Sequence, residues 1–244
     1  MALLEVKNIS KFFGGLKAVR KLSFSLEKGE LLGMIGPNGA GKTTAFNMIA
    51  GYFAPDAGEV FFNGENITGL RPWDVCRKGV VRTFQLSKPF GNLSVFDNIM
   101  VGTFYHQQNR LLARKKAEEI MEFIEMTGQR DVEGYNLTAF DRKKLELGRA
   151  LATGPQLLLL DEVVAGANPH EAAAMMQLIK RVQKNGITLL IVEHVMKVIM
   201  GLSDRLVVLH HGEKLAEGSP DEISCNEKVL KAYLGEKYAR TRNS

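Results

Sequence analysis

The sequence predicts an α/β fold in which a parallel sheet carries a glycine-rich, phosphate-binding loop. Two observations lead to this prediction. A glycine-rich segment at residues 36–44 stands between a short apolar run and a run compatible with a helix. From residue 156 onward, apolar runs alternate with amphipathic segments of helical spacing. Such alternation is typical of parallel sheets, which bind ligands at the carboxyl ends of their strands.

The N-terminal part is expected to form a small antiparallel sheet beside the loop. Residues 1 to about 30 alternate loosely between apolar and polar side chains and contain turn-forming glycines, so they are typical of short strands joined by turns. Residues 59–63 continue this alternation before a turn at Gly64. These segments together predict an antiparallel sheet that flanks the phosphate-binding loop.

The loop itself fits the pattern G-x-x-x-x-G-K-[ST]. Its predicted nucleotide-binding residues are Gly36, Pro37, Asn38, Gly39, Ala40, Gly41, Lys42, Thr43 and Thr44. The glycines let backbone N–H groups approach phosphate oxygens with no Cβ in the way, and the next helix adds the positive end of its dipole. We expect Lys42 to place a charge on the outer phosphates and Thr43 to offer a hydroxyl to Mg²⁺. The alternative, a glycine-rich loop that binds nothing, is disfavoured because the required strand and helix flank the motif.

Residues 89–150 are expected to form a mainly helical lobe. β-branched residues become rare there, and the segment 111–127 carries apolar side chains at helical spacing among charged ones. The apolar positions are Leu112, Ala117, Ile120, Met121 and Ile124.

The C-terminal part returns to buried strands, expected at 157–160, 188–192 and 205–209, with a helix over 170–184. Asp161 and Glu162 directly follow the first of these strands. A carboxylate at Asp161 would hold Mg²⁺ through water, and Glu162 would orient or deprotonate a water that attacks the terminal phosphorus. The alternative is an acidic helix N-terminus, where carboxylates are also favoured.

Length and composition limit the number of domains, the cellular compartment and the partners that we expect. The 244 residues suit one large domain or one domain with a lobe, and no apolar run approaches the roughly 20 residues that span a bilayer. Cys76 and Cys225 lie far apart without metal-ligand spacing, which favours a reducing cytoplasm. The net charge of +5 is compatible with nucleic acid or an anionic membrane face. No aromatic residue is interleaved with the basic clusters, so nucleic acid is not an expected partner, and 237–244 is expected to be a solvated basic tail.

Beyond these motifs, the chain resembles the ATP-binding subunits of ABC transporters from Leu4 to about Glu236. The resemblance implies one ABC ATPase domain over 1–244, with a P-loop NTPase (RecA-like) core at 1–88 and 151–236 and a helical signature lobe at 89–150. It implies that Phe13 stacks on the adenine of ATP, with Phe12 as a rival for this role. It also implies that Gln85 touches Mg²⁺ and the attacking water, and that His194 is the switch histidine that contacts the γ-phosphate.

Several segments resemble the ATPase subunits of hydrophobic amino acid importers, with the branched-chain amino acid importers of bacteria as the nearest type. These segments are residues 82–85, 95–102, 165–171 and 229–235. Importers of urea and short amides are related, share much of this sequence and remain an alternative.

One motif departs from the family pattern. A Leu-Ser-x-Gly-Gln-like signature is expected at the start of a helix in the helical lobe, but the aligned residues are Leu137, Thr138, Ala139, Phe140 and Asp141. Phe140 replaces a glycine whose backbone should approach the γ-phosphate, and Asp141 puts a negative charge where a neutral amide is usual. We therefore expect this signature to bind the γ-phosphate poorly.

In this family two subunits enclose two ATP molecules, and each site joins one subunit's phosphate loop to the other's signature. The departure therefore predicts a heterodimer with a second, different ATPase subunit, with one strong and one weak hydrolytic site. The resemblance also implies two permease subunits, an indirect role for a periplasmic or extracellular solute-binding protein, and a place on the cytoplasmic face of the membrane. A largely regulatory ATP-binding subunit, or an ABC protein that acts on ribosomes or DNA, are the competing interpretations.

Overall fold

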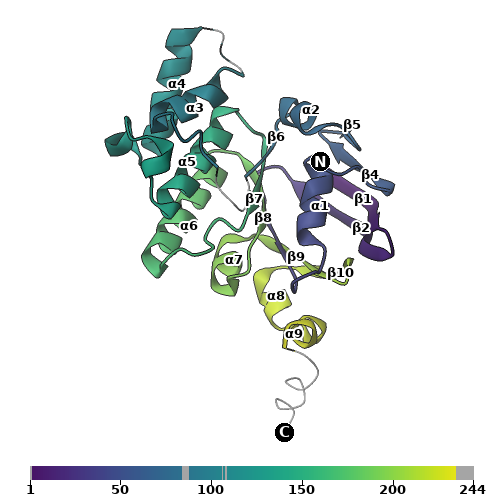
Figure 1. The fold of residues 1–244 in the computed structure, drawn as a ribbon. Coiled ribbons are helices and arrows are strands. Elements are labelled where there is room, and N and C mark those ends of the chain that lie inside the picture. The colour runs from purple at the N-terminus through teal and green to yellow at the C-terminus, as the bar shows by residue number, and fades with distance from the viewer. Residues whose placement is uncertain (1, 84–87, 106, 108, 235–244) are drawn as a thin grey trace.

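The computed structural model describes residues 2–83, 88–105, 107 and 109–234. The N-terminal part forms a four-stranded antiparallel sheet in the order β2-β1-β4-β5 (Figure 1). Its strands are β1 (Ala2–Phe13), β2 (Leu16–Glu27), β4 (Ala57–Phe62) and β5 (Glu65–Asn66). The predicted antiparallel sheet is thus confirmed, although β1 and β2 are each 12 residues long rather than short. Asn63 and Gly64 both have positive φ and form the tight turn between β4 and β5.

The second sheet has six strands in the order β10-β9-β3-β8-β7-β6. They are β3 (Leu31–Ile35), β6 (Val80–Arg82), β7 (Leu157–Asp161), β8 (Thr188–Val192), β9 (Arg205–His210) and β10 (Glu213–Gly218). All neighbours pair in parallel except β9 and β10, which form an antiparallel hairpin. Because β3, β7 and β8 are buried along their whole length, they read as continuous apolar runs in the sequence.

Two hydrophobic cores lie on the two faces of this sheet. Side chains alternate between the faces along each strand, so Leu158 and Leu160 enter one core while Leu157 and Leu159 enter the other. The first core is shared with helices α3 to α7, and the second with the antiparallel sheet and α1. The parallel sheet is therefore covered on both sides, which holds the ends of its strands in fixed positions around the phosphate loop.

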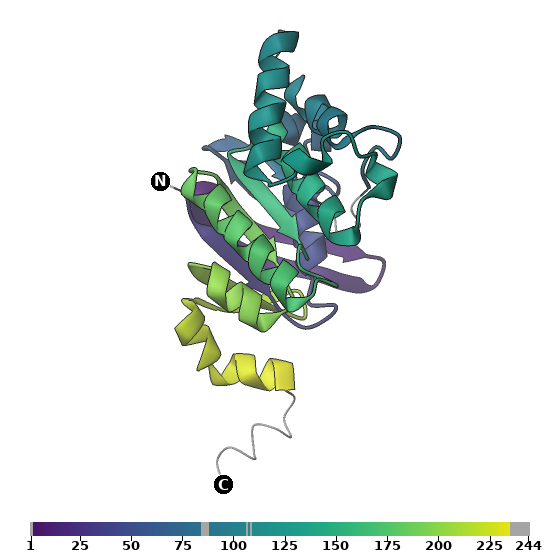
Figure 2. The same ribbon diagram turned by 90° about the vertical axis from the view of Figure 1, so that its left-hand side faces the viewer.

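The helices complete these layers. They are α1 (Lys42–Ile49), α2 (Pro72–Arg77), α3 (Val95–Thr103), α4 (Arg110–Phe123), α5 (Ala139–Ala152), α6 (Pro169–Lys184), α7 (Met196–Leu202), α8 (Pro220–Ser224) and α9 (Glu227–Leu234), with 3-10 turns at Thr127–Gln129 and Gly134–Asn136. Figure 2 shows the teal helices α3 and α4 at one end of the molecule and the yellow helices α8 and α9 at the other. Among the described residues, no helix is both long enough and apolar enough to cross a membrane.

The helix predicted over 111–127 is shorter than expected. It ends at Phe123, because Glu125 adopts a left-handed conformation with φ of 59° that interrupts the helical hydrogen bonding. Residues Thr127–Gln129 then form a separate 3-10 turn. The error arose because the apolar side chain of Ile124, buried at the end of the helix, continues the helical spacing past the actual end.

Candidate nucleotide site

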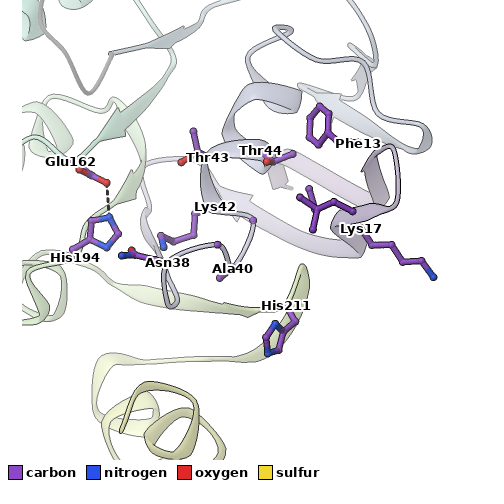
Figure 3. A pocket seen from close by; sticks show the side chains of 14 residues that line it. Phe13, Lys17, Asn38, Ala40, Lys42, Thr43, Thr44, Glu162, His194 and His211 are labelled. Carbon is purple, nitrogen blue, oxygen red and sulfur yellow. Dashed lines mark hydrogen bonds and ion pairs between the residues drawn. The ribbon is translucent and has the colours of Figure 1, made fainter. Parts of the chain in front are cut away.

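A cavity of about 580 Å³ lies where the phosphate loop meets the ends of the parallel strands (Figure 3). It is lined by Phe13, Leu16, Lys17, Ala18, Asn38, Gly39, Ala40, Gly41, Lys42, Thr43, Thr44, Glu162, His194 and His211. Residues far apart in sequence therefore meet at one place, as the topology of a parallel sheet predicts. Gly36, Pro37 and Asp161 are not among the lining residues.

The loop takes its shape from glycines packed against the protein's own backbone. A Cβ on Gly36 would lie 2.2 Å from the carbonyl oxygen of Leu209, and a Cβ on Gly41 would lie 2.5 Å from that of Ala18. Gly39, by contrast, faces open space and has a φ of 79°. Two of the three glycines are thus required for close packing inside the chain, a reason that the sequence alone did not reveal.

Lys42 opens helix α1 and turns its amine back across the loop. Its Nζ donates to the carbonyl oxygens of Gly36, at 2.7 Å, and Pro37, at 3.1 Å. Burial lowers the pKa of Lys42, and the carboxylates of Glu162 and Asp161 act in the opposite direction. The buried amine therefore interacts electrostatically with the two carboxylates that the sequence singled out.

Asp161 ends strand β7 and is almost fully buried. Its Oδ2 accepts a hydrogen bond from Arg82 at 2.7 Å, and its backbone N–H donates to the hydroxyl of Thr83 at 3.3 Å. Arg82 also donates to the side-chain oxygen of Asn47 on α1. The carboxylate thus lies in a fixed, charge-paired setting behind the loop.

Glu162 and His194 come from neighbouring strand ends and face each other. Glu162 Oε1 lies 2.5 Å from His194 Nε2, the contact drawn as a dashed line in Figure 3. Glu162 has a φ of 51°, an unusual conformation for a residue other than glycine, and its N–H donates to Val192 O at 2.9 Å. Backbone strain of this kind costs on the order of 1–3 kcal/mol and concentrates at functional sites.

The structure distinguishes between the two candidate aromatic residues. Phe12 and Phe13 are both 42% exposed, but Phe13 lines the cavity and Phe12 does not. Phe13 packs edge-on against Phe53, with ring centroids 5.4 Å apart. Gln85, the remaining predicted site residue, lies outside the described residues.

Sequence reasoning did not identify several residues at or beside the site. Lys17 and His211 line the cavity from the β1–β2 and β9–β10 hairpins, and no motif singles them out. The β9–β10 turn reaches the loop because the N–H of Gly212 donates to Ala40 O at 3.1 Å. Glu193 is buried and accepts hydrogen bonds from Val164 N and His194 N. Its place between a strand and a histidine was the only signal available.

The altered signature forms a closed set of hydrogen bonds at the start of α5. The Thr138 hydroxyl accepts from the Asp141 N–H at 3.1 Å and donates to Asp141 Oδ2 at 2.7 Å. Gln129 Nε2 donates to the same carboxylate oxygen at 3.0 Å. The hydroxyl and the carboxylate therefore satisfy one another within the chain, as in a helix N-cap.

Lys143, on the same helix, links α5 to the loop that follows β7. Its Nζ donates to the carbonyl oxygens of Ala165 and Glu162, the latter at 3.4 Å. Burial lowers the pKa of Lys143, and Glu193, followed by Glu162, acts in the opposite direction. The loop after Glu162 is thus held in part by the signature helix.

Comparison with known proteins agrees with this geometry. The family model of ABC transporters matches residues 19–165, and that of the branched-chain amino acid ATP-binding cassette transporter matches residues 213–239. The high-affinity branched-chain amino acid transport ATP-binding protein BraF of Pseudomonas aeruginosa is 38% identical over 254 residues, covering 96% of this chain and 98% of BraF. A probable branched-chain amino acid transport ATP-binding protein, LivG of Archaeoglobus fulgidus, is 36% identical over 247 residues, covering 96% of both chains.

A solved structure extends the match to three dimensions. The crystal structure of the ADP conformation of an ATP-binding cassette of an ABC transporter is 32% identical with a TM-score of 0.86, covering 97% of this chain and all of that one. The predicted fold class and the family resemblance are both confirmed. The chain belongs to the ABC transporter family as an ATPase, and within it to the ATP-binding proteins of the branched-chain amino acid transporter type.

Proposed function

We propose that this chain binds and hydrolyses ATP at the cavity around the phosphate loop to power uptake of branched-chain or related hydrophobic amino acids. One observation carries the proposal: Lys42, Glu162 and His194 converge on a single cavity. The names of the relatives, which are transport proteins for branched-chain amino acids, support the choice of solute.

Each residue has a role that follows from its position. The loop N–H groups and Lys42 bind the phosphates, and Phe13 stacks on the adenine. Glu162 orients or deprotonates the attacking water, while His194 holds the Glu162 carboxylate through their 2.5 Å contact and reaches the γ-phosphate. Gln85 is proposed to contact the same water. The charge that develops on the transferred group is offset by the fixed cation of Lys42.

Mg²⁺ is the second proposed component of the site. The Thr43 hydroxyl would hold it directly and the Asp161 carboxylate through water, with Gln85 as a further ligand. Oxygen donors are the ligands that Mg²⁺ prefers, and it is usually held by one or two carboxylates together with phosphates and water. When bound, Mg²⁺ supplies charge neutralisation for the phosphates.

The proposed assembly is a transporter with two permease subunits, at the cytoplasmic face of the membrane, served indirectly by an extracellular or periplasmic solute-binding protein. The single cassette would move as a core, residues 1–88 and 151–236, and a helical lobe, residues 89–150. The segment after Gln85 that includes Lys88, Pro89 and Phe90 would receive a short permease helix. Arg149 supports this segment by donating to Lys88 O at 3.0 Å.

The proposed ATPase partner is a different subunit, because Thr138 and Asp141 already bond to one another. A γ-phosphate from a partner would meet the carboxylate of Asp141, which repels it. This chain's own phosphate loop needs an intact signature from elsewhere. Its ATP site would therefore be the strong one of the pair.

ATP turnover by the purified chain, alone and mixed with the second ATPase subunit, tests this proposal. We expect turnover to rise well above the sum of the separate activities on mixing. Equal activity alone and mixed would contradict it. Uptake assays with leucine, isoleucine, valine, urea and short amides distinguish the proposed solutes from those of the alternative importer type.

A further inference from the structure

Arg82, the last residue of β6, joins the two elements that carry the proposed magnesium ligands. Its guanidinium donates to Asp161 Oδ2 at 2.7 Å on β7 and to Asn47 Oδ1 on α1. Asn47 lies one helical turn beyond Thr43, so the two side chains share a face of α1. Arg82 thus holds β7 and α1 at a set spacing behind the phosphate loop.

Burial and hydrogen bonding hold the ion pair of Arg82 and Asp161 in one geometry. The Arg82 and Asp161 side chains are only 8% and 4% exposed. A buried charge pair offsets its desolvation only when further hydrogen bonds complete it, and Asn47 provides such a bond to the guanidinium. The guanidinium also lies 5.9 Å from the ring centroid of Phe46 and 5.8 Å from that of Tyr52.

A lysine could not reproduce this arrangement. The planar guanidinium presents several donors in a rigid fork, so it bonds Asp161 and Asn47 at once, whereas an ammonium is a single point charge on a flexible stem. The substitution Arg82→Lys therefore keeps the positive charge and removes the bridge between Asp161 and Asn47.

We propose that Arg82 is a positioning residue that orients the Asp161 carboxylate relative to Thr43 and thereby sets the affinity of the nucleotide site for Mg²⁺. This inference rests on the proposed function only for the presence of a magnesium–nucleotide complex. Arg82 acts through Asp161, because its guanidinium is bonded to that carboxylate and does not line the cavity.

The test compares Arg82→Lys, which keeps the charge, and Asn47→Ala, which removes the bridge but keeps the ion pair. Arg77→Lys is the matched control, since Arg77 pairs with Asp74 at the exposed surface of α2. The first readout is the melting temperature with ATP over a range of Mg²⁺ concentrations, compared with ATP in EDTA. The second is the Mg²⁺ concentration for half-maximal ATP hydrolysis by the complete transporter.

We expect Arg82→Lys to raise the Mg²⁺ concentration required in both readouts by roughly tenfold, with Asn47→Ala shifting it in the same direction by less. Binding of ATP in EDTA should stay at the wild-type level, as should every value for Arg77→Lys. An unchanged Mg²⁺ requirement in both variants would overturn the proposal. Equal losses with Mg²⁺ and with EDTA would also overturn it, because Arg82 would then support the fold or the nucleotide itself.

The two readouts separate this proposal from the proposed function. A wild-type transporter that binds Mg²⁺–ATP but does not hydrolyse it would contradict the proposed function, while the melting temperatures would still decide the role of Arg82. If Arg82→Lys fails to fold, Asn47→Ala alone decides the outcome, since it leaves the ion pair in place.

Discussion

Helices α1 and α5 differ in what lies at their first turn. Helix α1 has no side-chain cap and no acidic residue in its first turn. Helix α5 is capped by Thr138 and carries Asp141 in its first turn. A helix N-terminus attracts anions, so α1 is open to an external phosphate while α5 supplies its own carboxylate. The comparison predicts a strong anion site at the start of α1 and a weak one at the start of α5.

The largest effect should come from removing the cation at α1. Lys42→Ala should lower ATP turnover by the complete transporter roughly a hundredfold or more, because the loop loses its preorganised charge. Thr138→Ala at α5 should leave this turnover close to the wild-type value and cost about 1 kcal/mol of stability through the lost N-cap. Steady-state kinetics and denaturant unfolding measure the two effects. Equal losses of turnover in both variants would remove the proposed asymmetry.

Restoring the family pattern at α5 should raise activity. The double variant Phe140→Gly and Asp141→Gln removes the internal carboxylate and the side chain that blocks backbone approach. We expect coupled transport in proteoliposomes to increase by severalfold. Ala139→Gly is the control, because it alters the same turn and leaves Asp141 bonded to Thr138. No gain in the double variant would mean that these positions do not limit the weak site.

Most of the fold and much of the site followed from local patterns. Buried strands such as β7 and β8 could be predicted because both of their faces are covered, which makes the sequence continuously apolar. The site residues at strand ends followed from the same topology. Three features could not be predicted. They are the close packing of Gly36 against Leu209, the contact of Gly212 with the phosphate loop, and the bridge that Arg82 makes between Asp161 and Asn47. These depend on segments that meet only after the chain has folded, and no short-range spacing reports them.

A smaller effect should distinguish the glycines of the phosphate loop. Gly36→Ala should destabilise the protein by about 1–3 kcal/mol, because its Cβ would lie 2.2 Å from Leu209 O. Gly39 faces open space, so Gly39→Ala should lower the free energy of unfolding by only about 1 kcal/mol, through backbone strain at positive φ. Urea unfolding of both variants measures the difference. A larger loss at Gly39 would show that packing behind the loop does not determine its shape.

The smallest expected effect concerns pH and Lys143 on α5. Because burial lowers the pKa of Lys143 in the folded protein, the unfolded chain binds more protons at alkaline pH. The contribution of Lys143 to stability should therefore rise as pH increases through the lowered pKa of the folded state toward the ordinary lysine pKa of 10.5. Unfolding free energies of the wild type and Lys143→Met, compared between neutral and alkaline pH, isolate this contribution. A contribution that falls with rising pH would contradict the direction.

The central claim is that hydrolysis takes place at this chain's own phosphate loop, with Glu162 activating the water. The direct measurement is ATP turnover by the complete transporter in proteoliposomes when only this chain carries Glu162→Gln. We predict a fall of roughly a hundredfold or more with ATP binding retained, as expected for loss of a general base. Turnover close to that of the wild type would contradict the claim and assign this chain a regulatory role.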